Sequence, residues 1–313
     1  MITTRGLANL PRGLELGSVV SIGVFDGVHL GHQAILAANL ARARKSGLTP
    51  AVVTFAGHPK QVLLGRAPKT LTTLEHRLAL FERAGIEHAV VLHFDEQLRS
   101  MDAAAFAQTV LIDALGAQAF VLGFDSKFGK GRSGGPELLR ELGHEVTVVD
   151  RVSSDQRAIS STAIREAVEL GDLDGATRML GRPVSILGEV VHGQALGRTL
   201  GFPTANLDLH HELHPPTGVY AGWAHPWRAG ERHAEPLAAV ANIGTRPTLA
   251  GTPPNDPTIE VHLLDFAADL YGSQLEFEFV RFLRPEQRFG DLDELRAQIA
   301  RDVETTRTCL RSD

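Results

Sequence analysis

The sequence predicts an α/β domain built on a parallel sheet, followed by a compact antiparallel β domain that ends in a helix. Three observations support this fold class. The chain has 313 residues, which is more than one ordinary hydrophobic core contains. Up to about residue 180, apolar strands alternate with amphipathic helices. After residue 181, short apolar runs are separated by Gly, Pro, Asn and Asp, so we place the domains at 1–181 and 182–313.

The first domain contains continuous apolar segments that fit buried parallel strands. Such strands are covered by helices on both faces, so their sequences are apolar throughout rather than alternating. Thr72 and Glu75 have the spacing of a capping box at the start of one helix. The predicted strands are 19–25, 50–55, 88–94 and 119–124, and the predicted helices are 33–47, 72–85 and 102–116.

The second domain loses the helical periodicity until its last segment. Its apolar runs are short, and turn residues separate them, which is typical of a barrel or a sandwich. An amphipathic helix over 292–310 then closes the chain. The runs are SILGEVV, GVYAGWA, LAAVANIG, IEVHLLDF and LEFEFVRFL.

Composition excludes several classes of protein. Cys309 is the single cysteine, which rules out an internal disulfide framework and argues against a zinc site built on cysteines. The net charge of −6 argues against a general nucleic-acid-binding protein. No apolar run approaches the roughly 20 residues that span a bilayer, and the first residues lack a signal-peptide pattern. We therefore expect a soluble cytoplasmic protein without nucleic-acid or membrane partners.

Two histidines, His29 and His32, stand where the first predicted strand passes into a helix, in SIGVFDGVHLGHQAIL. Ligands of parallel sheets bind beyond the carboxyl ends of the strands, and a helix N-terminus attracts phosphate. Two imidazoles there could stabilise charge on a phosphate during transfer. The alternative is that one histidine caps the helix and the other lies on the surface. The paired arrangement favours the phosphate site.

A second stretch, ISSTAIREAVELG (159–171), has the residues of another phosphate clamp. Ser160, Ser161 and Thr162 precede a predicted helix, and Arg165 follows three residues later. Hydroxyls, helix N–H groups and a guanidinium together suit a phosphate. An ordinary N-cap would explain one hydroxyl, although not three hydroxyls and an arginine.

These motifs resemble the HxGH nucleotidyltransferase superfamily. The segment VLGFDSKFGKGRSG (121–134) matches a further family motif, GFDxxFGxGRxG. The whole chain resembles the bacterial bifunctional riboflavin kinase/FMN adenylyltransferases, also called FAD synthetases. The resemblance implies a Rossmann-like first domain that transfers AMP from ATP to FMN, releasing pyrophosphate. It implies that His29 and His32 hold the ATP phosphates and stabilise the transition state, with Ser161, Thr162 and Arg165 gripping the triphosphate. It also implies flavin contacts for His58 and Asp125.

Two departures from the family pattern concern this first domain. The family usually has TFxPHP after the second strand, whereas TFAGHP (54–59) has Gly57 in place of proline and so a looser loop. The family often has SSTRIR, and here Ala163 replaces the first arginine while Arg165 remains.

The Gly129–Gly134 segment fits GxGxxG but lacks the strand that a dinucleotide site requires. We interpret it as a basic loop that either covers an anion or is a solvated surface.

The second domain contains GRTLGFPTANLDL (197–209), in which Thr204 and Asn206 offer hard oxygen ligands of the kind Mg²⁺ prefers. The alternative is a polar turn entering a strand. The stretch matches the PTAN motif of riboflavin kinases, and five further segments match in order: PPTGVYAG (215–222), ANIGTRPT (241–248), IEVHLLDF (259–266), DLYG (269–272) and FLRPEQRF (282–289). The resemblance implies a β-barrel in which Thr204 and Asn206 hold Mg²⁺ and ATP phosphates, Glu260 is the general base for the riboflavin 5′-hydroxyl, and Arg284 contacts the flavin. The alternative for Glu260 is an exposed strand carboxylate.

The sequence therefore predicts an enzyme that converts riboflavin to FMN and FMN to FAD, with riboflavin, FMN and ATP as substrates and Mg²⁺ as cofactor. We expect a monomer or a weak oligomer. One alternative keeps a single active half, and Gly57 makes the adenylyltransferase the more vulnerable one. Another is a flavin-binding storage or regulatory protein. HxGH transferases that act on nicotinamide or pantetheine phosphates fit residues 1–180 and leave the second domain unexplained.

Overall fold

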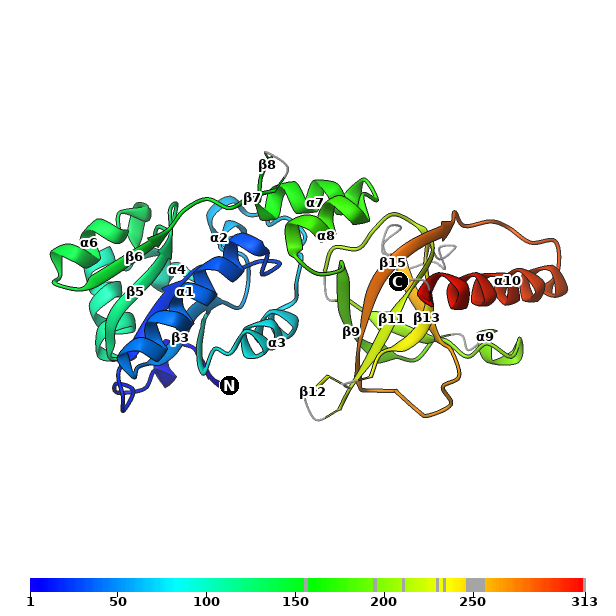
Figure 1. Ribbon diagram of the computed structural model, residues 1–313, viewed down its shortest axis with the longest axis horizontal. Coiled ribbons are helices and arrows are strands. Elements are labelled where there is room, and N and C mark those ends of the chain that lie inside the picture. The colour runs from blue at the N-terminus through cyan, green and yellow to red at the C-terminus, as the bar shows by residue number, and fades with distance from the viewer. Residues whose placement is uncertain are drawn as a thin grey trace. The chain divides into compact units, whose positions relative to one another are not determined.

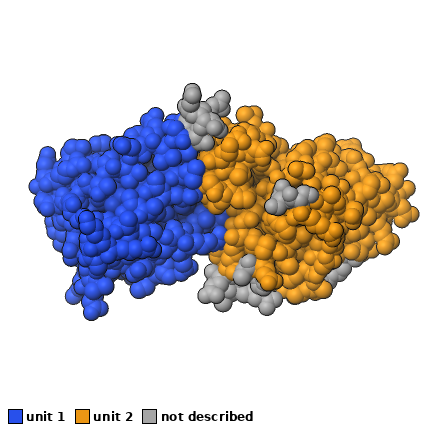
Figure 2. Space-filling view, viewed as in Figure 1, with its two compact units in different colours: residues 1–161 blue, residues 162–313 orange. Residues whose placement is uncertain are grey.

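The computed structural model describes residues 1–154, 157–193, 196–209, 212–228, 231–232, 235–245 and 257–311. The chain divides into two compact units, Met1–Ser161 and Thr162–Asp313 (Figure 2). Helix α7 (Ser161–Glu169) begins at this division, and α8 (Leu173–Leu180) follows it. Each unit is built on its own sheet (Figure 1).

The first unit is a parallel sheet with helices, as the sequence predicts. Among the described residues its strand order is β1-β4-β3-β2-β5-β6, and every pairing is parallel. The strands are β1 (Ile2–Arg5), β2 (Ser18–Ile22), β3 (Thr49–Phe55), β4 (His88–Leu92), β5 (Ala117–Gly123) and β6 (Glu145–Val149). The helices are α1 (Leu30–Ser46), α2 (Lys60–Leu64), α3 (Leu74–Ala84), α4 (Glu96–Ser100), α5 (Ala103–Phe106) and α6 (Pro136–Glu141). A two-stranded β7 (Ser153–Ser154) and β8 (Arg157–Ala158) precedes α7.

Alternate residues of the central strands enter cores on opposite faces of this sheet. Val53 and Val90 pack with Phe106 on one face, whereas Val52 and Val91 pack with Phe81 on the other. Both sets are almost completely buried, which explains why the strands carry no polar alternation. The predicted helix over 102–116 consists of α5 followed by a π-helical stretch, Ala107–Asp113.

The second unit is a closed antiparallel barrel, which decides between the barrel and the sandwich. Within the described residues, the order β11-β13-β14-β10-β9-β15 returns to β11 through the β11–β15 pairing. These strands are β9 (Ser185–Val191), β10 (Ala205–Asp208), β11 (Gly218–Arg228), β13 (Leu237–Thr245), β14 (Pro257–Leu263) and β15 (Gln274–Arg284). A short β12 (Glu231–Arg232) pairs with β11, and α9 (Leu196–Thr199) precedes β10.

The C-terminal helix α10 (Leu292–Leu310) packs against β11, β13 and β15. The barrel core contains Phe277 and Phe279 of β15 and Tyr220 of β11, whose rings meet edge to face. Burial raises the pKa of Tyr220 to about 12, and its hydroxyl donates to the Pro216 carbonyl at 2.7 Å. The buried hydroxyl of Tyr220 therefore has its hydrogen-bond partner within the protein.

Candidate active sites

The chain leaves β2 through a turn whose backbone is unusual. Phe25, Gly27 and Val28 have φ values of 54°, 81° and 38°, and two of these three residues are not glycine. Left-handed backbone is unfavourable for a β-branched residue such as Val28 and persists only where neighbouring groups hold it. The turn is therefore stabilised by tertiary contacts.

Asp26 and Thr72 supply part of that support. The Asp26 carboxylate is buried and accepts hydrogen bonds from the backbone N–H groups of Leu71 at 2.9 Å and Thr72 at 3.2 Å. The Thr72 hydroxyl in turn accepts from the Gly27 N–H at 3.1 Å. Asp26 thus ties the turn to the start of α3, consistent with a structural role for this carboxylate.

Arg77 of α3 supplies the rest, and the sequence analysis did not identify it. Its buried guanidinium donates to the Val24 carbonyl and, at 2.8 Å, to the Phe55 carbonyl, so it binds the ends of β2 and β3 together. Burial lowers the pKa of Arg77 to about 10, although Asp26 and Glu75 oppose the shift. A buried arginine inside an amphipathic helix gives no distinctive sequence signal.

His29 and His32 lie together at the N-terminus of α1. The helix begins at Leu30, three residues before the predicted start at residue 33. His29 is therefore its N-cap, and His32 belongs to its first turn. The rings stack with centroids 3.6 Å apart and 15° between their planes. His29 Nδ1 accepts the His32 backbone N–H at 3.3 Å, which leaves Nε2 as the His29 ring nitrogen that carries a proton in the neutral form. The edge of Phe25 supports the His32 ring, with centroids 5.2 Å apart.

Ser161, the first residue of α7, contacts this turn directly. Its hydroxyl donates to the Asp26 carbonyl at 3.0 Å, although 135 residues separate the two in sequence. Thr162 and Arg165 follow on the same helix, and Arg165 is buried. The structure therefore brings one residue of the ISST motif to the HxGH turn.

The two predicted flavin residues follow the strands on either side of β2. His58 comes after β3, where its Nδ1 accepts the Lys60 N–H at 3.1 Å, and Asp125 comes after β5 and is exposed. Because β3 and β5 both pair with β2 in parallel, these residues and the histidine turn lie together at the carboxyl ends of the strands. Gly57 is exposed, and a side chain there would meet open space.

An open cavity of roughly 340 Å³ lies against the barrel, and the predicted kinase residues line it. Glu260 of β14 is paired in register with Asn206 of β10 on one side and with Asn242 of β13 on the other. Side chains of directly paired residues point to the same face of a sheet, with Cβ atoms about 5 Å apart. All three line the cavity, and Thr204 joins them from the segment before β10. A carboxylate thus stands between two amides.

Asn206 has features of a ligand-binding residue. Its side chain is buried, and its Oδ1 has no hydrogen-bond partner among the described residues. A Cβ atom at position 193 would lie 2.2 Å from Asn206 Nδ2, so Gly193 allows the backbone to approach this amide closely. A buried carbonyl oxygen without a partner is costly unless a ligand completes it.

Two family models match successive parts of this chain. The FAD synthetase family model matches residues 13–163, and the riboflavin kinase family model matches residues 180–310. A bifunctional riboflavin kinase/FMN adenylyltransferase of Escherichia coli (strain K12) is 41% identical over 308 residues, covering 97% of this chain and 96% of that protein. The enzyme of the same name from Bacillus subtilis (strain 168) is 39% identical, covering 91% and 90%. This chain belongs to the bifunctional riboflavin kinase/FMN adenylyltransferase family.

A solved structure also has this arrangement of elements. It is described as a macrolide-efflux protein from Streptococcus pneumoniae and is 33% identical, with a TM-score of 0.82 over 98% of this chain and 99% of that one. In the part of this family member that the structure describes, no helix is both long enough and apolar enough to cross a bilayer.

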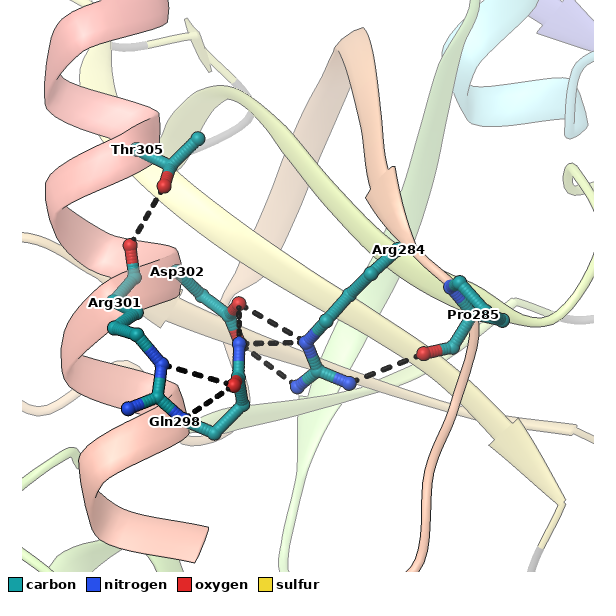
Figure 3. A network of polar contacts seen from close by, with 6 residues as sticks. All are labelled: Arg284, Pro285, Gln298, Arg301, Asp302 and Thr305. Carbon is teal, nitrogen blue, oxygen red and sulfur yellow. Dashed lines mark hydrogen bonds and ion pairs between the residues drawn. The ribbon is translucent and has the colours of Figure 1, made fainter. Parts of the chain in front are cut away.

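Arg284, the predicted flavin contact of this family member, also lines the barrel cavity. It forms a bidentate ion pair with Asp302 of α10, in which Nε lies 3.0 Å from Oδ1 and Nη2 lies 2.8 Å from Oδ2 (Figure 3). Asp302 and Asn242 are two polar lining residues that sequence reasoning missed. Asn242 stood in a segment matched to the family, yet only strand register places it beside Glu260.

A second cavity of roughly 260 Å³ lies against the PTAN segment of this family member. Thr204 lines both cavities, whereas the rest of the second wall is mainly apolar and includes Phe266, Leu270 and Tyr271. An apolar wall suits a flat ring, and the shared Thr204 places this second cavity next to the one that Glu260 lines.

Proposed function

We propose that the barrel transfers the γ-phosphoryl group of ATP to the 5′-hydroxyl of riboflavin and that the first unit transfers AMP from ATP to FMN. The kinase assignment is carried by the row Asn206–Glu260–Asn242 within one cavity. The adenylyltransferase assignment rests on the stacked His29 and His32 at the N-terminus of α1. Family membership supports both activities on one chain.

In the kinase step, Glu260 accepts the proton of the riboflavin 5′-hydroxyl as its oxygen attacks the γ-phosphorus, and ADP leaves. The amide of Asn242 holds the hydroxyl or the carboxylate in line. Phosphoryl transfer requires mostly positioning and neutralisation of charge, which side chains fixed on three paired strands provide. The apolar cavity beside Thr204 takes the adenine ring.

Thr204 and Asn206 would hold the Mg²⁺ ion. The buried, unpartnered Oδ1 of Asn206 among the described residues fits a hard cation, because amide and hydroxyl oxygens are ligands that Mg²⁺ accepts alongside phosphate oxygens. The described residues contain no cluster of three or more His, Cys, Asp or Glu side chains that could hold a metal. When bound, the ion neutralises charge on the transferring phosphates.

In the adenylyltransferase step, an FMN phosphate oxygen attacks the α-phosphorus of ATP and pyrophosphate leaves. The protonated Nε2 of His29 and the N–H groups at the start of α1 stabilise the charge that develops on the phosphates. His58 and Asp125, which follow the neighbouring strands, contact the flavin. The grip of Thr162 and Arg165 on the triphosphate stays a prediction from their sequence motif.

The domain boundary at 181/182 is supported by the local structure around it. Helix α8 ends at Leu180, Gly181 adopts left-handed backbone with φ of 72°, and β9 begins at Ser185. The riboflavin kinase family model begins at residue 180, next to this boundary, whereas the FAD synthetase model ends at residue 163 and the compact units divide after Ser161. A cytoplasmic location and a monomeric or weakly associated state stay predictions.

The deciding experiment follows the flavins by chromatography while purified protein is incubated with riboflavin, ATP and Mg²⁺. FMN that appears first and is then converted to FAD is the expected result. FMN that accumulates without FAD would contradict the adenylyltransferase assignment and direct attention to Gly57. Flavin that binds tightly without any turnover of ATP would contradict both assignments.

A further inference from the structure

A polar network joins the end of β15 to the C-terminal helix beside the barrel cavity (Figure 3). Arg284 and Asp302 are its centre, with side chains only 18% and 7% exposed. Gln298, one turn earlier on α10, donates to Asp302 Oδ1 at 2.9 Å, and Arg301 donates to Gln298 Oε1 at 2.6 Å. The carboxylate is thus itself held in place.

This network leaves the Arg284 guanidinium little freedom. Asp302 accepts from its Nε and Nη2, and the Pro285 carbonyl accepts from Nη1 at 3.1 Å. Bonds on three nitrogens fix the plane of the group as well as its position. The guanidinium carbon lies 5.9 Å from the centre of the Phe289 ring. Arg284 and Phe289 both line the cavity, and the network fixes the guanidinium beside the ring.

The ion pair also changes what Arg284 offers to a ligand. The adjacent carboxylate offsets the guanidinium charge, so the pair contributes a flat polarisable face rather than a net positive charge. That favours a neutral ring over a phosphate group. The surrounding lining agrees, because Leu295 and Ile299 lie on the same face of α10 as Asp302 and also line the cavity.

We propose that Asp302 is a positioning residue of the kinase site, which fixes Arg284 and Phe289 as the wall against which the isoalloxazine ring of riboflavin packs. The inference rests on the proposed kinase function and adds a specificity element to it. Asp302 acts through Arg284 and does not touch the reacting atoms. Its loss should weaken the binding of the ring and spare both the chemistry at Glu260 and the binding of ATP.

The test uses the full chain and two variants. Asp302→Asn turns one acceptor into a donor facing Arg284, and we expect it to raise the KM for riboflavin about tenfold with kcat and the KM for ATP within about twofold. Glu304→Gln is the matched control, because Glu304 is an exposed carboxylate on the same helix. The double variant R284M/D302L replaces the pair by apolar side chains, a change that often preserves stability.

The double variant separates positioning from a purely structural clamp. Positioning predicts a melting temperature near that of the wild type together with a riboflavin KM that is still raised. A riboflavin KM restored along with stability would overturn the proposal, as would an unchanged KM in Asp302→Asn. Absence of FMN formation by the wild type would instead contradict the proposed function. Quenching of riboflavin fluorescence would then still measure binding in the same variants.

Discussion

The two sites of this chain are assembled in different ways. In the first unit, the histidines belong to one turn of consecutive residues, and buried groups from elsewhere only hold the turn. In the barrel, Asn206, Glu260 and Asn242 come from three strands and meet only because of their register. A site built from one turn is written contiguously in the sequence, whereas a site built across a ladder is not.

The difference also determines which substitutions should be tolerated nearby. The strained turn depends on Asp26, Thr72 and Arg77, so remote changes can displace both histidines together. The barrel row depends on backbone pairing, which most side-chain substitutions leave intact. Variants of single residues should therefore separate the two activities cleanly.

The largest effect should come from Glu260→Gln in the barrel. Removing the general base should lower the rate of FMN formation from riboflavin by about 10²–10⁴, while FAD formation from added FMN is unchanged. Separate assays with riboflavin and with FMN measure the two rates. Glu189→Gln is the control, because Glu189 is an exposed strand carboxylate of the same barrel. Equal loss of both activities would contradict the independence of the two sites.

The reciprocal change is His29→Ala in the first unit. It removes a phosphate donor and the N-cap of α1 at once, so FAD formation from FMN should fall by about 10²–10³, while FMN formation stays normal. His93→Ala is the comparison, because His93 is exposed just after β4. Helix content measured by circular dichroism checks that capping is not the whole effect. FAD formation within twofold of the wild type would remove His29 from the site.

How far the sequence reaches differs between these sites for physical reasons. The HxGH turn, the central strands and the family were all predicted from contiguous residues, and the comparisons confirm the family. Strands β1 and β6 were missed because they lie at the edges of the sheet and bury few apolar side chains. Asn242 and Asp302 were missed because register and helix packing, rather than local pattern, bring them to the cavity.

Asn242→Ala tests whether register alone identifies a functional residue. Because Asn242 flanks Glu260 without being the base, we expect kcat of the kinase to fall about tenfold, the value of one hydrogen bond to a charged group. The KM for ATP and the adenylyltransferase rate should not change. Initial rates over a range of riboflavin concentrations separate kcat from KM. Unaltered kinetics would mean that Asn242 is only part of the cavity wall.

The smallest effect concerns the amino ends of the strands in the first sheet, whereas the histidine turn lies at their carboxyl ends. His88 begins β4, where its Nε2 lies 3.1 Å from the Thr4 hydroxyl, and burial lowers its pKa below the ordinary 6.5. The folded unit therefore binds a proton less readily than the unfolded chain. The contribution of neutral His88 to the free energy of unfolding is fully present above the pKa of the unfolded chain. It is lost as the pH falls from there through the lower pKa of the folded state.

We expect the wild type to lose more stability than His88→Gln between about pH 7.5 and pH 5.5. Hydrogen exchange of peptides from each unit locates the loss, which should fall on the parallel sheet and leave the barrel unaffected. Thermal melts of both proteins at each pH give its size. Parallel pH dependence in the two proteins would show that His88 does not couple protons to folding. His88 lies at the amino end of β4, so neither catalytic rate should depend on the titration of His88. The test thus separates the stability of the sheet from the chemistry at the carboxyl ends of its strands.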